Sequence, residues 1–285
     1  MELSLQYWYL FPLSILIATI AMSSGIGGAV FFSPIFMLGL HLEPKTAIGA
    51  ALATELFGFT SGLIAYYKDK LIDYQLALNL LVFSIPAAVI GTIYGGLIDA
   101  VVLKTIFATG LLFIGYQIHS SWRSDEREKF EIKHVEEFKT TYESELVDRS
   151  GTIYRYTICN KNMGRVFAAI GGAFVGMISV GLAELQEYHL VARCKVPTPV
   201  AVATSVFVVV ITVLFASIGH FYEFFKSGGE VLNQVMNIII FTIPGVIIGG
   251  QIGPRLQKSL PEDKMKIGIA ILFILVGLFM LYSLI

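Results

Sequence analysis

Two glycine-rich segments could bind a small anion through their backbone. The first reads Ser-Ser-Gly-Ile-Gly-Gly over residues 23–28, and the second reads Gly-Met-Ile-Ser-Val-Gly over residues 176–181. A helix that breaks at such a segment leaves backbone N–H groups without intrahelical partners, and a helix N-terminus adds partial positive charge. We therefore predict an oxyanion site at the two breaks, with two hydroxyls from the helix that follows the second one. Its residues are Gly25, Gly27, Gly28, Ser179, Gly181, Thr204 and Ser205.

Close helix packing is the alternative explanation for these small residues. We prefer packing for the glycines that lie beyond the breaks and anion binding for those within them, Gly176 included. The former are Gly91, Gly95, Gly249 and Gly253. The hydroxyls of Thr204 and Ser205 could equally bond to their own helix backbone.

Glu55 could carry a proton. It is the ionisable residue that lies deep within an otherwise uninterrupted apolar run, where a charge is costly. We predict that it couples proton movement to anion movement, either in exchange or together. A hydrogen-bonded structural carboxyl group is the alternative.

A polar segment follows the second break, from Glu184 to Lys195. It is too polar to face lipid, so we expect it to line an aqueous vestibule on the cytoplasmic side. Arg193 and Lys195 could attract anions, while Glu184 or Glu187 closes a salt bridge or gate. An interfacial arm whose charges reach water is the alternative.

Composition identifies an integral membrane protein. Of 285 residues, 55% are hydrophobic and only 14% are charged, which is too little polar surface to cover a soluble globule. No basic tract suggests nucleic acid, and no cofactor is indicated. Cys159 and Cys194 indicate neither a disulfide framework nor a CxxC metal site. His41 and His220 are expected at loop edges, and we predict no metal site.

Apolar runs of about 20 residues predict the membrane helices. We expect them near 7–24, 46–67, 75–97, 102–121, 164–182, 199–222, 231–253 and 265–285. The N-terminal run has no preceding Lys or Arg, so we interpret it as a membrane segment rather than a cleaved signal peptide. Shorter arms near 27–40 and 184–196 follow the two breaks and should form helical hairpins that turn inside the protein.

The two halves share one pattern. An offset of 153 places Gly28 on Gly181 and Pro44 on Pro197. An offset of 158 places Pro86 on Pro244, together with two glycines of each helix. Short, Gly/Pro-interrupted segments at matching places in two halves point to a transport site. We predict an all-α polytopic membrane protein with two inverted-topology repeats, residues 1–121 and 164–285.

Basic residues predict the orientation. If each break reverses the chain, Lys45, Lys104 and Lys226 share one side with both termini, and the other 17 of the 20 Lys and Arg residues lie opposite. Without reversal, the division would be 8 against 12. Because basic residues accumulate on the cytoplasmic side, we favour reversal, with both termini extracytoplasmic. The linker, residues 122–163, would then be cytoplasmic.

The linker begins with a charge run that reads as a solvated tether or helix extension. After it, segments 138–142 and 152–158 alternate polar and apolar residues on either side of Asp148 to Gly151. This pattern predicts a β-hairpin. A tether is the simpler role for the linker, and a regulatory or partner-docking element is the alternative.

In combination, these motifs resemble the TauE/SafE family of sulfite exporters. The resemblance rests on Gly-Ile-Gly-Gly with Pro34, on the run from Pro44, on the run from Pro197 to Ser205, and on the Pro86 and Pro244 helices. It implies secondary export of a small sulfur oxyanion or organosulfonate across a prokaryotic cytoplasmic membrane. The chain departs from the pattern at Gly181-Leu-Ala-Glu184, where a Gly-rich triplet would be expected, and at Ala29 and Ala51.

Other functions would use the same features differently. A passive anion channel could share the site and would differ only in lacking coupling. An intramembrane enzyme is less consistent with the sequence, because no HExxH, paired catalytic Asp or Ser/His arrangement occurs within the helices. We predict a transporter without catalytic residues, whose partners are the lipid bilayer and a small anionic substrate.

Overall fold

The computed structural model describes residues 5–24, 26–131, 144–257 and 262–283. Its first half contains a short 3-10 turn and then five helical elements, the second of which continues into a π-helical segment. They are η1 (Leu5–Tyr7), α1 (Leu10–Ser24), α2 (Ala29–Pro34) with η2 (Ile35–Gly39), α3 (Pro44–Lys68), α4 (Tyr74–Leu97) and α5 (Ala100–Glu131).

The second half repeats this order after a small hairpin. The hairpin strands are β1 (Ser144–Val147) and β2 (Ile153–Tyr156), and the helices are α6 (Lys161–Ile178), α7 (Leu182–Glu187) with η4 (Tyr188–Arg193), α8 (Thr198–Ser227), α9 (Gly229–Gln257) and α10 (Glu262–Tyr282). The predicted breaks and short arms are therefore present, with α2 and α7 beginning the arms.

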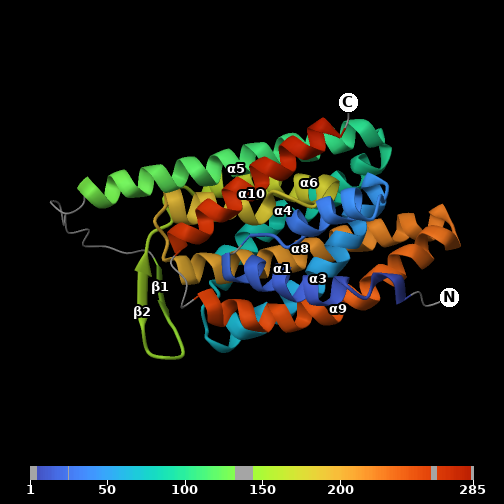
Figure 1. Ribbon diagram of the computed structural model, residues 1–285. Coiled ribbons are helices and arrows are strands. Elements are labelled where there is room, and N and C mark those ends of the chain that lie inside the picture. The colour runs from blue at the N-terminus through green and yellow to red at the C-terminus, as the bar shows by residue number, and fades with distance from the viewer. Residues whose placement is uncertain (1–4, 25, 132–143, 258–261, 284–285) are drawn as a thin grey trace.

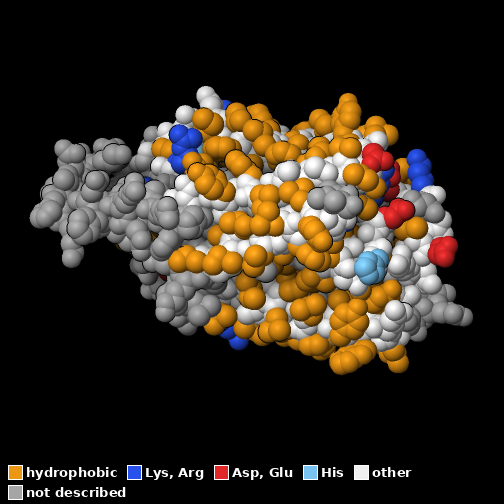
Figure 2. Space-filling view, turned by 45° about the horizontal axis from the view of Figure 1, so that its top comes forward, with side chains coloured by type: hydrophobic (Ala, Val, Ile, Leu, Met, Phe, Trp, Pro, Cys, Tyr) orange, Lys and Arg blue, Asp and Glu red, His pale blue; other side chains and the backbone are white. Residues whose placement is uncertain are grey.

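The surface suits a lipid environment. Among the described residues, four helices are long and apolar enough to cross a membrane, spanning Pro44–Lys68, Tyr74–Leu97, Thr198–Lys226 and Gly229–Leu256. Many large apolar side chains lie on the outside of the bundle, and Leu78, Ile93, Phe113 and Tyr222 are each about 60% exposed. In Figure 2, apolar side chains cover the middle of the molecule, while the coloured charges lie toward its two ends. The chain is therefore an all-helical membrane protein apart from its hairpin.

Glycines allow two helix pairs to approach closely. Side chains added at Gly91 and Gly95 of α4 would meet the backbone of α6, and side chains at Gly249 and Gly253 of α9 would meet α1. The packing interpretation of these four glycines is confirmed. Gly176 was assigned to binding, but a Cβ there would meet the backbone of α4, so its role is also packing. The two pairs correspond, because α1 and α6 are the first long helices of their halves and each packs against the later helix, α9 or α4, of the other half.

The two arms end with the same backbone turn. Leu40 N donates to Ile35 O and Cys194 N donates to His189 O, at 3.2 and 3.0 Å. In each arm the next residue then adopts the left-handed conformation, with φ 54° at both His41 and Lys195. These two residues are 154 positions apart, one more than the sequence offset. Both arms consequently end in the same kind of turn before α3 and α8 begin.

The connecting loops gather at two ends of the molecule. One end brings Glu43 and Lys45 beside Gly96, Glu223 and Val231 around a small cavity. The opposite end carries the hairpin, and Figure 1 shows both chain termini away from it. This grouping of loops is the one expected if each arm reverses the chain.

The β-hairpin forms at the predicted turn but with a different first strand. Ser144 pairs with Tyr156 and Val147 with Ile153, so β1 directly precedes the turn. The predicted strand at 138–142 lies outside the described residues. Asp148 explains the register, because its Oδ1 accepts from the N–H groups of Ser150 and Thr152. Hydrogen bonding, first from the Ser150 hydroxyl, lowers the pKa of Asp148.

Asp73 attaches the hairpin to the helix bundle. Its Oδ2 accepts a 2.7 Å hydrogen bond from the Tyr156 hydroxyl, and its Oδ1 caps α4 by accepting from Leu76 N. Its own N–H donates to Thr204 Oγ1 of α8 at 3.0 Å. Burial, and then the contact with Asp73, raise the pKa of Tyr156 well above its usual value. The linker is thus docked onto the ends of two membrane helices.

Candidate functional site at the two helix breaks

The first break faces a buried carboxylate. Ala29 begins α2, and its N–H donates to Glu55 Oε1 at 3.2 Å. Glu55 is 3% exposed and lies in the middle of α3, which packs against α2. The residue predicted to carry protons therefore contacts the backbone of the break directly.

The second break is a tight, partly left-handed turn. Ser179 follows the last residue of α6 and has φ 60°. Gly181 directly precedes α7 and has φ 115°, a conformation that residues other than glycine rarely adopt. Glu184, in the first turn of α7, reaches back so that its Oε2 accepts from Gly181 N at 3.0 Å. The carboxylate satisfies a backbone donor that the break leaves free.

The two breaks meet inside the protein. Gly27 N of the first break donates to Glu184 Oε1 at 3.2 Å, and the hydroxyls of Ser33 and Ser179 lie 2.7 Å apart. A Cβ at Gly27 would lie 3.0 Å from Glu55 Oε1 and 3.5 Å from Glu184 Oε1. Both carboxylates therefore adjoin the same glycine.

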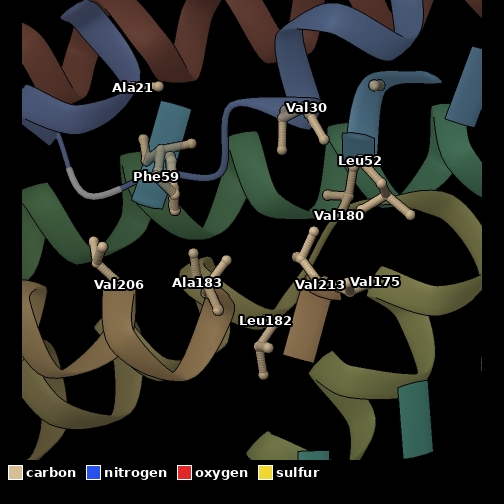
Figure 3. Packing of buried hydrophobic residues seen from close by; sticks show 14 of the residues in the cluster. Ala21, Val30, Leu52, Phe59, Val175, Val180, Leu182, Ala183, Val206 and Val213 are labelled. Carbon is tan, nitrogen blue, oxygen red and sulfur yellow. The ribbon is translucent and has the colours of Figure 1, made fainter. Parts of the chain in front are cut away.

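Apolar side chains surround this polar centre. Figure 3 shows Phe59 beside the first break, Val30 and Val180 on its other side, and Ala183 on α7 below, all from one buried cluster. Because this environment has a low dielectric, hydrogen bonds to a charged group are strong here and unpaired donors are costly. The N–H groups of the two breaks and the carboxylates that accept from them therefore lie within the apolar core of the protein.

The predicted hydroxyls have different surroundings. Thr204 is committed to Asp73 N, at the hairpin end of α8. Ser205 is buried, and its hydroxyl has no hydrogen-bond partner. Gln186 of α7 was not predicted as a site residue, yet both polar atoms of its buried amide also lack partners. A polar residue two positions from Glu184 on a short internal helix was the available signal. Unsatisfied groups of this kind call for a ligand or water.

The predicted gate is arranged differently. The Glu184 carboxylate accepts a hydrogen bond from Gly181 N. Among the residues that the structure describes, no ion pair connects Glu184 to Arg193. The proposed salt bridge is therefore wrong for Glu184, because the backbone donors of both breaks take its carboxylate. Arg193 is exposed at the end of η4, and Glu187 is half-buried. Gly28 is buried at the start of α2, while Gly25 lies outside the described residues.

A sulfur and imidazole cluster lies at the hairpin end. Cys159 and Cys194 form a disulfide, with Cα atoms 5.0 Å apart, and His189 Nε2 lies 3.7 Å from Cys194 Sγ. The sequence does not indicate this single bridge, because the two cysteines meet only where the arm of α7 and η4 folds back onto the start of α6. The same three residues could offer a Cys2His metal set only after reduction of the disulfide.

His220 was placed at a loop edge, but α8 continues past it. It is buried, and its Nε2 lies 3.0 Å from Gly176 O, just before the second break. It also lines the small cavity of about 100 Å³ at the end opposite the hairpin, together with Lys45 and Glu223. Polar groups therefore extend from this end toward the second break.

Comparison with known proteins identifies the family of the chain. The family model described as "Sulfite exporter TauE/SafE" matches residues 10–280. The chain is 23% identical to the "Probable membrane transporter protein YunE" of Bacillus subtilis (strain 168), over 98% of each chain. It is 24% identical to the "Probable membrane transporter protein YjnA" of the same organism, over 81% of this chain and 84% of the relative.

No solved structure shows a significant match. The family match covers both breaks, both arms and all the long helices. These findings indicate a multi-pass membrane transporter and not an enzyme. The chain belongs to the sulfite exporter TauE/SafE family.

Proposed function

We propose that the chain is a secondary transporter that exports a small sulfur-containing anion, such as sulfite or an organosulfonate, and binds it at the two helix breaks. The family name supports the substrate class. The protein would hold the anion with backbone N–H groups, which avoids the desolvation cost of a buried cationic side chain. Gln186 and Ser205 would supply further polar contacts.

One observation carries this proposal: a single carboxylate accepts N–H bonds from both breaks. Glu184 uses one oxygen for Gly27 N and the other for Gly181 N. Two donors that converge on one pair of carboxylate oxygens have the geometry for two oxygens of a sulfonate or sulfite. Glu184 therefore stands where the substrate would bind.

Glu184 and the substrate would compete for the same two N–H donors, so that binding of the anion would be coupled to protonation of Glu184. Charged acceptors make stronger hydrogen bonds than neutral ones, so protonation of Glu184 weakens its hold on both N–H groups. A substrate anion then replaces it without placing two negative charges in one buried site. Glu55, at Ala29 N beside Gly27, is placed to receive or return the proton. Anion and proton would bind together.

The direction of transport follows from the charge moved. A dianion that travels with one proton carries one net negative charge outward. An inside-negative membrane favours this movement by about 2.3 kcal/mol per charge for each 100 mV. Export of a cytoplasmic sulfur dianion would then proceed without a further energy source.

Inverted repeats would allow this site to face each side alternately. The same element order in the two halves, the paired glycine contacts of α4 with α6 and α9 with α1, and the matching turns at His41 and Lys195 support two repeats. We place both termini outside and the linker in the cytoplasm, because 17 of the 20 basic residues would lie on the linker side if each arm reverses the chain. Residues 1–121 and 164–285 would be the repeats, with 122–163 between them.

Flux measurements test the proposal. Purified protein in sealed vesicles should accumulate labelled sulfite against its gradient when the outside is made acidic, and Glu184→Ala should lose this pH-driven accumulation. Glu230→Ala, at the exposed start of α9, is the control for an acidic residue outside the site and should retain it. Voltage-driven flux that ignores the pH gradient would instead identify a channel. Absence of flux for sulfite, taurine and other sulfonates alike would refute the substrate class.

A further inference from the structure

We propose that the Cys159–Cys194 disulfide is a site of covalent modification by sulfite, which opens the bridge and releases the second arm. The choice of nucleophile rests on the proposed function, but the reaction is independent of transport. The bridge joins the residues just before α6 to the last residues of the arm that carries Glu184. A sulfur anion that acts on it could regulate its own export.

Sulfite is a nucleophile that cleaves disulfides without any added oxidant or reductant. Its sulfur forms a bond to one cysteine sulfur, the S–S bond breaks, and its electron pair leaves on the other cysteine as a thiolate. One dianion and one proton are consumed, giving one S-sulfonate and one thiol. The sulfite sulfur is oxidised while the leaving cysteine sulfur is reduced, so the electrons balance. The free thiol can reverse the reaction when sulfite falls.

The geometry fixes the direction of cleavage. Cys159 is exposed, whereas Cys194 is buried, with 8% of its surface accessible. Attack therefore occurs on Cys159, and Cys194 is the leaving group. His189 Nε2 lies 3.7 Å from Cys194 Sγ, within reach to give the departing thiolate a proton.

The surrounding charges favour an approaching anion. Lys161 follows Cys159 by two residues, and Arg193 and Lys195 flank Cys194, with both of the latter exposed. Lys161 and His189 also line a cavity of about 130 Å³, together with Asn79 and Asp73. Three basic residues near one disulfide raise the local concentration of a dianion. Among the residues that line this cavity, Asp73 is the acidic one.

The location explains why such a bridge would be reactive. It lies at the linker end, the side that the basic residues assign to the cytoplasm. Disulfides in the cytosol are rare and, where present, are usually transient or sensing. A bridge that accumulating sulfite opens has this character. Opening it would remove the covalent connection between α6 and η4, while Tyr156 and Asp73 keep the hairpin docked.

Mass spectrometry of the full chain tests the reaction. Protein purified without reductant should show an intact bridge, and sodium sulfite with iodoacetamide should add one sulfonate and one alkyl group. Peptide mapping should place the sulfonate on Cys159 and the alkyl group on Cys194. Free thiols before treatment, a sulfonate on Cys194, or no reaction when oxidised glutathione in the same tube is cleaved would each overturn the proposal.

The role of His189 and the effect on the arm have separate tests. His189→Gln should slow cleavage by tenfold or more while leaving bridge formation intact. Hydrogen exchange over 188–196 should accelerate after sulfite treatment and in Cys159→Ser, with no further change when sulfite is added to that variant. An unchanged cleavage rate in His189→Gln would contradict the role of His189 as proton donor. Unchanged hydrogen exchange would contradict the proposed release of the arm. Cleavage without flux would instead contradict only the proposed transport function.

Discussion

Removal of the Glu184 carboxylate should create a protein that requires an anion for stability. Glu184 accepts two buried N–H bonds, from Gly27 at 3.2 Å and from Gly181 at 3.0 Å. A buried donor left without an acceptor costs about 1–3 kcal/mol, so Glu184→Ala should lose about 2–6 kcal/mol of folding free energy. Added sulfite should restore much of this loss, because its oxygens replace those of the carboxylate.

The same change should tighten anion binding. In the native chain, an anion must displace a charged acceptor whose hydrogen bonds are worth about 1.5–3 kcal/mol each. Removing even about 2.8 kcal/mol of this competition would strengthen binding about 100-fold. At 100 times its dissociation constant, the anion would then add about 2.7 kcal/mol of stability.

Thermal unfolding across a sulfite titration measures both effects. The titration should use a Cys159→Ser background, so that the disulfide does not consume sulfite, with Glu230→Ala at the exposed start of α9 as the control. Low starting stability and a large sulfite-dependent rise are expected only for Glu184→Ala. A rise in Glu184→Ala no larger than that of the parent protein would refute the assignment of these donors to the substrate.

Three further predictions concern the site and the linker. Glu55→Gln should impair pH-driven flux more than sulfite binding, because the anion's own donors remain; a native rate at every pH would make Glu55 structural. Gly27→Leu and Gly181→Leu should abolish binding in folded protein, whereas Gly95→Ala should lower stability first; sulfite binding by both Leu variants would move the site elsewhere. The lowered pKa of Asp148 stabilises the folded turn above its unfolded pKa, and this stabilisation is lost as the pH falls through the folded value. The protection of amides 148–152 from hydrogen exchange, expressed relative to the intrinsic exchange rate at each pH, should therefore fall on acidification, and unchanged protection would contradict this.

Much of the fold could be predicted because local signals determine it. Long apolar runs identify membrane helices, and glycines beside them identify the breaks, as residues 179–181 illustrate. The part of the charge run up to Glu131 forms the helical end of α5, and the turn from Asp148 to Gly151 was located correctly. These features depend on residues that are neighbours in the chain.

The site required information that spacing does not contain. Glu184 and Gly27 are 157 positions apart, and nothing local shows that a carboxylate from one arm reaches the other break. Cys159 and Cys194 are 35 positions apart and meet only because the second arm folds back. His220 was misplaced because α8 extends beyond the apolar window, so that a polar residue near its end is still buried.

The position of a bound anion would test the central claim most directly. Crystals of the protein soaked with selenite, a sulfite analogue with a strong anomalous signal, would locate it independently of the protein's own sulfur atoms. We predict a peak between the two breaks, within hydrogen-bonding distance of Gly27 N and Gly181 N, with the Glu184 carboxylate displaced from both. Selenite bound elsewhere while Glu184 still holds both N–H groups would contradict the claim.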